Sequence, residues 1–108
     1  MQAIDKQWSS QEEKIAQEAF NKAYNREIAT LIQEIEQRAK QVEVAEDLWH
    51  LHDHLSAKRH EIDGKYHYDP STLLFILAEL VQGGWLRLQE LEGLEKDKVS
   101  KIKALTLM

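Results

Sequence analysis

The chain has 108 residues, of which 14 are Lys or Arg and 19 are Asp or Glu, so its formal net charge is −5. This length fits one domain, residues 1–108, and the acidic balance argues against nonspecific nucleic-acid binding, which needs clustered basic side chains. The absence of cysteine excludes disulfides, thiol nucleophiles and cysteine-ligated zinc sites.

Residues that break helices are rare, because the chain has one proline and four glycines, and we therefore expect an all-α protein. The first helix is predicted to begin at Ser9 or Ser10, since Ser9 with Glu12 and Ser10 with Glu13 both have the spacing of a capping box. It is predicted to continue to Lys40. Apolar residues recur along it at helical spacing, which is typical of packing against another helix: Phe20, Tyr24, Ile28, Leu31, Ile35 and Val42.

The predicted first helix is longer than a globule of this size. A helix over residues 10–40 spans about 46 Å, whereas a compact chain of this length is roughly 34 Å across. Either the helix protrudes with its apolar stripe in water, or it packs on a second chain. We favour a homodimer with this helix in an extended dimerisation stalk, and its expected interface is Phe20, Tyr24, Ile28, Leu31, Ile32 and Ile35.

A second helix is predicted from about Ala45 to Asp63, with Gly64 ending it in the left-handed conformation. Its expected core stripe is Val44, Leu48, Leu51, Leu55 and Ile62. Together with the first helix it would form the stalk, residues 9–66.

The remaining residues, 69–108, are predicted to form a small helical head. Asp69 is a helix N-cap and Pro70 occupies the first helical position, where proline fits well. The third helix then covers Ser71 to Gln82 and ends at Gly83-Gly84. A short helix over Gln89–Leu94 and a last helix from about Asp97 complete the head.

Two features bear on location. The segment from Met1 to Ser10 is polar and lacks the apolar core of a signal peptide, so a cytosolic protein is expected. The most apolar stretch, Leu73 to Val81, contains Glu79 and is much shorter than the roughly 20 residues that cross a bilayer.

Three alternating histidines suggest metal binding or catalysis at first sight. Alternate helical residues point roughly 200° apart, however, so only His50 and His54 share a face, and no third or fourth ligand has a suitable spacing. His52 next to Asp53 would likewise diverge by about 100°. We expect solvated histidines, no metal and no catalytic residue, and keep a metal-dependent enzyme using His50, His54 and Asp53 as a third alternative.

The same helix carries a more informative stripe. Trp49, His52, Ser56 and Arg59 follow at steps of three, four and three, with Asp53 beside them, and such a face is typical of an interface hot spot. The equally weighted alternative is a tryptophan that covers the core. Asp53 and Arg59 are six residues apart, so their pairing would need a bent chain or a neighbouring subunit.

Two further features lie in the head. Phe75 belongs to an apolar run and is expected in the core. The lysines of the last helix, Lys98, Lys101 and Lys103, are expected on a solvated face, where they could steer an acidic partner.

The run from Asp47 to Tyr66 closely resembles the signature of the fluorescence recovery protein family of cyanobacteria. The likeness extends over nearly the whole chain. It includes Trp8-Ser9 and Phe20 to Tyr24 at one end, and Asp97-Lys98 and Ser100 to Leu105 at the other.

This resemblance implies an all-helical homodimer that is not an enzyme and has no cofactor. Such proteins bind the orange carotenoid protein, the light-activated quencher of the phycobilisome antenna. They accelerate its return from the red active form to the orange resting form and promote its release, so that antenna fluorescence recovers. A cytoplasmic, thylakoid-proximal location follows, peripheral to the membrane through the phycobilisome and without insertion.

The resemblance also implies functional residues. A surface at the dimer interface corresponds to Trp49, His52, Asp53 and Arg59, and a second patch on the head corresponds to Phe75 and Lys101. The alternative function is a homodimeric helical adaptor for another regulatory protein.

Overall fold

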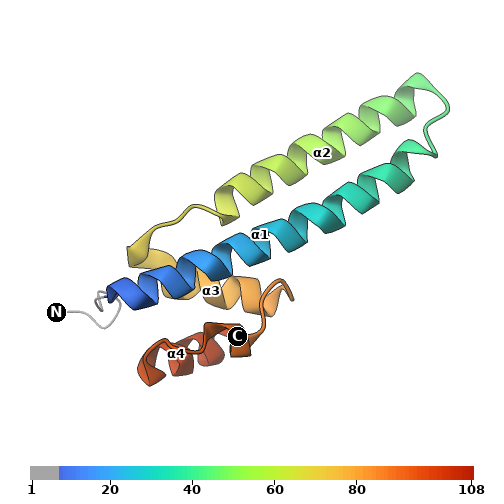
Figure 1. The fold of residues 1–108 in the computed structure, drawn as a ribbon. Coiled ribbons are helices and arrows are strands. Elements are labelled where there is room, and N and C mark those ends of the chain that lie inside the picture. Colours follow the sequence, from blue (N-terminus) through green and yellow to red (C-terminus); the bar gives the residue numbers. More distant parts are fainter. Residues whose placement is uncertain (1–7) are drawn as a thin grey trace. The chain divides into compact units, whose positions relative to one another are not determined.

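The structure is a computed structural model that describes residues 8–108. Its regular elements are helices, as the scarcity of proline and glycine predicted (Figure 1). The four α-helices are α1 (Ser10–Ala39), α2 (Ala45–Lys65), α3 (Leu73–Gln82) and α4 (Lys96–Thr106), with two short 3-10 helices, η2 (Pro70–Thr72) and η3 (Leu88–Leu91). The all-α class and the long N-terminal helix, 30 residues, are confirmed. No helix over residues 8–108 combines the length and apolar character that a membrane span requires.

The start of α1 has the capping box that the sequence predicted. The Ser9 backbone N–H donates to Glu12 Oε1, and the Glu12 backbone N–H donates to Ser9 Oγ, both at 3.1 Å. These reciprocal bonds satisfy two of the amide groups that a helix leaves without partners at its start. The helix ends at Ala39, one residue before the predicted end.

The chain divides into two compact units, and each is described by itself. The first, which we call the head unit, consists of the described residues up to Asn25 together with Tyr68–Met108. The second, the hairpin unit, is Arg26–His67. The helix α1 therefore contributes its first half to the head unit and its second half to the hairpin unit.

The head unit is built around α3, whose sequence from Leu73 to Gln82 is apolar apart from Glu79 and Gln82. Leu73, Leu77 and Leu80 are fully buried, and α3 packs against α4. The first half of α1 presents small residues and one aromatic ring to this core. The other buried apolar side chains of the unit are Ala16, Ala19, Phe20, Ala23, Leu74, Ala78, Leu86, Leu91, Leu94 and Ile102.

The turns of the head unit follow their sequence signals. Asp69 Oδ1 accepts a hydrogen bond of 3.0 Å from the Ser71 backbone N–H, so Asp69 is the expected N-cap. The first turn after it is the 3-10 helix η2, and the α-helix α3 begins only at Leu73. Gly83 caps the end of α3, and Gly84 has a φ of +85°, a backbone conformation that favours glycine.

The hairpin unit contains two antiparallel helices, the second half of α1 and all of α2 (Figure 1). At its turn, Asp47 Oδ2 accepts from the backbone N–H groups of Glu43 and Val44, at 3.2 and 3.3 Å. At the other end, the buried Glu27 carboxylate accepts from Lys65 Nζ at 2.8 Å and from the Tyr66 hydroxyl at 2.8 Å. Hydrogen bonds therefore hold the start of α2 to the turn before it and the end of α2 to Glu27 of α1.

The end predicted for α2 is wrong. The helix continues through Lys65, and the Tyr66 N–H donates to the carbonyl of Ile62 at 3.0 Å. Gly64 lies within the helix, since among the glycines of the described chain only Gly84 and Gly93 have a positive φ. The Lys65 and Tyr66 side chains both bind Glu27, and these contacts hold the last turn in helical form.

The core stripe predicted for α2 is also partly wrong. Ile62 is buried and Leu51 is half-buried, but Leu48 and Leu55 are 48% and 41% exposed, and Val44 is 59% exposed. One helix, α1, is packed against α2 in this unit, and it covers one side only. The two leucines lie beside the covered side and remain in contact with solvent.

Candidate functional site

The exposed side of α2 carries the residues that the sequence singled out. Trp49, His52, Asp53, Ser56 and Arg59, which we call the α2 surface, all lie on this helix and are all exposed. Trp49 is 61% exposed, so it does not cover the core of its own chain, and the core alternative for this residue is wrong. A large exposed aromatic ring beside an arginine is the composition of a protein-binding hot spot.

The charged groups of the α2 surface have partners within the helix. His52 Nδ1 lies 3.3 Å from Asp53 Oδ1, and Arg59 Nε lies 3.7 Å from Asp63 Oδ2. Asp63 was not among the predicted site residues, although its spacing of four from Arg59 is the helical spacing at which side chains meet. Within the chain, Arg59 therefore pairs with Asp63, and Asp53 pairs with its histidine neighbour.

The α2 surface is bordered by apolar side chains. Leu48 and Leu55, seven residues apart, are each nearly half exposed, and Ile32 on α1 of the same unit is 53% exposed. Exposed apolar groups that gather in one region, with polar groups around them, mark interaction sites in soluble proteins. In the single chain, the hairpin unit thus leaves Ile32, Leu48 and Leu55 each more than 40% exposed.

The residues predicted to form a dimer interface differ in their exposure. Ile32 is the most exposed at 53%, and Tyr24, in the head unit, is 43% exposed. Ile28, Leu31 and Ile35 are half-buried within the hairpin unit. Phe20 is only 4% exposed, because its ring packs edge-on against Tyr68 with the ring centres 5.5 Å apart, and a second chain could cover little more of it.

The second predicted patch lies in the head unit. Phe75 is 50% exposed on α3, between the buried Leu74 and Leu77, so its expected place in the core is wrong. Lys101 on α4 is half-buried. A solvated face was predicted for three lysines of α4, but Lys98 is completely buried and forms an ion pair with Glu12 at 2.6 Å.

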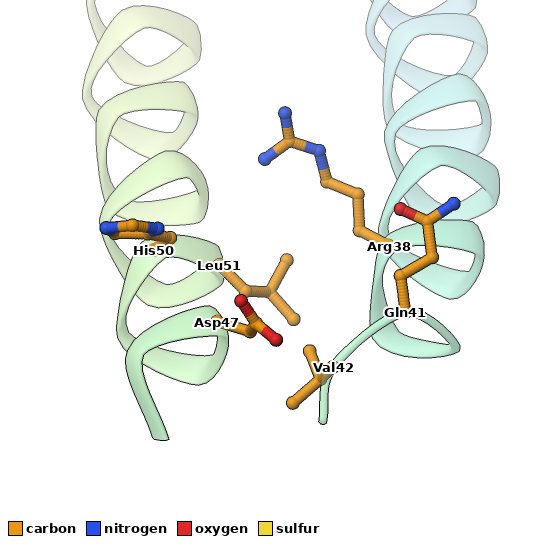
Figure 2. A pocket seen from close by; sticks show the side chains of 6 residues that line it. All are labelled: Arg38, Gln41, Val42, Asp47, His50 and Leu51. Atoms are coloured by element: carbon orange, nitrogen blue, oxygen red, sulfur yellow. The ribbon is translucent and has the colours of Figure 1, made fainter. Parts of the chain in front are cut away.

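A shallow pocket of about 220 Å³ lies at the turn of the hairpin, and six residues line it. Figure 2 shows Arg38 reaching from α1 into the space between the helices, while His50 points away from it. Arg38 Nε is 3.7 Å from Glu34, and His50 Nε2 is 3.9 Å from Glu46. Arg38 and His50 therefore each lie near a glutamate of their own helix. The lining residues are Arg38, Gln41, Val42, Asp47, His50 and Leu51.

The histidines of α2 separate rather than converge. His50 faces Glu46, whereas His54 Nε2 turns toward α1 and lies 2.8 Å from Glu34 Oε2. His54 is half-buried, which differs from the solvated position expected for it. Over residues 8–108, no three His, Asp or Glu side chains are grouped as a metal ion would require.

Comparisons with known proteins agree on one family. The family model described as photoprotection regulator fluorescence recovery protein matches residues 8–106. A fluorescence recovery protein of Synechocystis is 46% identical over 105 residues, which cover 97% of this chain and 96% of that protein. The solved structure of the Fremyella diplosiphon fluorescence recovery protein gives a TM-score of 0.90 at 54% identity, over 94% of this chain and 100% of that one. The Synechocystis structure gives the same TM-score, 0.90, at 46% identity and the same coverage.

Proposed function

The chain belongs to the fluorescence recovery protein family of photoprotection regulators, and from this premise we propose that it binds the photoactivated orange carotenoid protein. Binding accelerates the return of that protein from the red active form to the orange resting form. It also promotes release from the phycobilisome, and antenna fluorescence is restored. The chain acts in the cytoplasm near the thylakoid as a regulator and not as an enzyme, and it needs no cofactor.

The observation that carries this proposal is the exposed α2 surface. Trp49 and Arg59 are the residue types that dominate protein-binding energy when a partner covers them. Here both side chains are largely exposed, at 61% for Trp49 and 84% for the Arg59 side chain, so both are available to a partner. We assign partner binding to Trp49, His52, Asp53 and Arg59.

The second patch supports contact with a partner at two places. Phe75 is half exposed, whereas the leucines of the same helix, α3, are all buried. We assign it, with Lys101, a role in partner binding. Two separate contacts on one chain suit a partner with two domains.

The physical requirement on such a regulator is strict. A binding protein shifts a conformational equilibrium only by its different affinity for the two states. To accelerate the return it must also favour the transition state between them. Binding that holds two separated domains of the partner near each other favours this transition state. A dimer also raises the local concentration of the second binding contact.

We propose a homodimer in which the hairpin units of two chains meet. Ile32, Leu48 and Leu55 are exposed in the single chain, and a second copy would remove this apolar area from water. The single-domain organisation, with a stalk over residues 9–66 and a head over 69–108, remains a prediction that belongs to this proposal.

The proposal is tested with purified protein and photoactivated orange carotenoid protein in the dark. Loss of the red absorbance should be faster with the wild-type chain. Trp49→Ala should raise the concentration needed for half of the acceleration about 30-fold, the effect of losing a contact of about 2 kcal/mol. Arg59→Ala should also weaken the effect.

The matched control is Leu107→Ala, which truncates an apolar side chain that is 82% exposed in the head unit and outside both patches. It should leave the acceleration unchanged. A wild-type chain that leaves the dark return rate unaltered would overturn the proposal. In that case the homodimeric adaptor for another regulatory protein becomes the better interpretation, and a pull-down that returns no carotenoid protein would agree with it.

A further inference from the structure

Asp63 extends the α2 surface by one helical turn. It follows Arg59 by four residues, so positions 49, 52, 56, 59 and 63 continue the alternation of steps of three and four. Its Oδ2 atom is 3.7 Å from Arg59 Nε, and the two side chains are 71% and 84% exposed. Neither side chain contributes to the buried core.

Helix stability does not account for this carboxylate. Asp63 lies in the last turn of α2, where the helix dipole disfavours negative charge. Its order relative to Arg59, with the cation nearer the helix start, is the less favourable order for a pair four residues apart. An ion pair this exposed also contributes little to the stability of the fold.

Other nearby charges are engaged elsewhere. Asp53, the other carboxylate of this surface, is next to His52 at 3.3 Å. Glu61, in the same turn as Asp63, lies 4.0 Å from both Lys58 and Lys65, about half a turn around the helix. Within the described ion pairs, Asp63 is the carboxylate paired with Arg59.

We propose that Asp63 is a positioning residue for Arg59 and that the arginine it positions receives a carboxylate of the partner. The contact between the two groups joins Asp63 Oδ2 and Arg59 Nε at 3.7 Å, and the Arg59 side chain is 84% exposed. A guanidinium bound at one edge still has donors for a bidentate bond to a second carboxylate. The partner contact is thus an acidic side chain. This inference rests on the proposed function and adds a residue to its site.

The test is the dark return of the carotenoid protein over a range of regulator concentrations. Asp63→Asn should raise the half-effective concentration about fivefold, a coupling typical of residues in direct contact. Asp63→Glu, which retains the charge, should restore most of the effect. The matched control is Glu61→Gln, which removes the same charge from the same turn on another side of the helix, and it should have the wild-type value.

A double-mutant cycle separates positioning from a general structural role. If Asp63 acts through Arg59, Asp63→Asn should cause no further loss in a chain that already carries Arg59→Ala. A further fivefold loss in that background would overturn the inference, as would a change in sedimentation caused by Asp63→Asn alone.

A measurement on the free protein completes the test. The order parameter of the Arg59 Nε–H bond by NMR should fall in Asp63→Asn and stay unchanged in Glu61→Gln. A wild-type chain without effect on the carotenoid protein overturns the proposed function and this role together. An active wild-type chain with a fully active Asp63→Asn variant overturns the role of Asp63 alone.

Discussion

At the scale of single residues, the buried ion pair between Glu12 and Lys98 is the most unusual contact in the head unit. Lys98 is fully buried, its Nζ lies 2.6 Å from Glu12 Oε1 and 3.5 Å from Glu95, and it also lies over the Trp8 ring. Glu12 Oε2 accepts from the Glu95 backbone N–H at 2.9 Å. One carboxylate therefore joins the start of α1 to the start of α4.

These contacts set the ionisation of Glu12. Burial alone would raise its pKa, but the hydrogen bonds from Lys98 and from the backbone N–H groups of Glu95 and Ser9 outweigh burial and lower the pKa from 4.5 to about 2. Because the folded pKa is the lower one, the carboxylate stabilises the fold above about pH 4.5. That stabilisation is lost as the pH falls toward 2.

This lowered pKa leads to a prediction about acid stability. Between pH 5 and pH 2, the wild-type chain should lose about 3 kcal/mol of its free energy of unfolding through Glu12. A variant with Glu12→Gln and Lys98→Met replaces both partners and should lack this part of the decline. Urea unfolding at a series of pH values, followed by circular dichroism, measures the difference. Parallel curves for the two proteins would contradict the assignment.

The site residues show how far sequence reasoning reaches at this scale. The spacing of Trp49, His52, Ser56 and Arg59 predicted a shared side of α2, because a regular helix fixes which residues align. The partner of Arg59 was missed, since Asp53 was considered and the spacing of four to Asp63 was not. The burial of Lys98 could not be predicted, because its partner Glu12 is 86 residues away in the sequence.

At the scale of elements, helix boundaries depended on contacts that local sequence does not contain. The start of α1 was predicted correctly from its capping box, since both partners lie within four residues. The end of α2 was predicted two residues too early, at Asp63 instead of Lys65, because glycine is a common helix stop signal. Glu27, 38 residues before Lys65, holds the last turn in helical form, and no local pattern indicates this.

The helical position of Gly64 leads to a second stability prediction. Gly64→Ala should raise the free energy of unfolding by roughly 0.5–1 kcal/mol, because alanine loses less backbone entropy in a helix and its Cβ would have no atom within 4 Å. Urea unfolding at pH 7 measures the change. A destabilised variant would mean that Gly64 adopts the left-handed conformation in solution.

Gly93 provides the opposite control in the same experiment. Its φ is +106°, and an added Cβ would lie 2.5 Å from Ile15 Cδ1, where α1 approaches the loop before α4. Gly93→Ala should therefore lower the free energy of unfolding by about 1–3 kcal/mol. The two substitutions replace the same residue type, so their opposite effects on the free energy of unfolding come from the backbone conformation and the neighbouring atoms at each glycine.

At the scale of the whole molecule, composition and periodicity predicted an all-α chain with a long first helix. They did not predict which apolar positions stay exposed, because a periodic pattern marks every side of a helix that meets a neighbour, whether that neighbour belongs to the same chain or to another. Leu48 and Leu55 show this limit. Their spacing predicted a core position, and the single chain leaves both nearly half exposed.

This exposure leads to the prediction about oligomeric state. Ile32→Glu on α1 and Leu48→Glu on α2 should each convert the proposed dimer to monomers in analytical ultracentrifugation. A carboxylate buried without a partner costs about 3 kcal/mol or more, and a two-fold interface contains it twice. Leu107→Glu, at an exposed position of the head unit, is the matched control and should remain dimeric.

The two substitutions also distinguish between the helices as interfaces. If only Leu48→Glu yields monomers, the second chain covers the side of α2 that carries Trp49 and Arg59, and partner binding then competes with or depends on the dimer contact. If only Ile32→Glu yields monomers, the α2 surface is free in the dimer. The dimer then presents two copies of this surface to a partner at once. Dimers that survive both substitutions would contradict an interface on the hairpin unit.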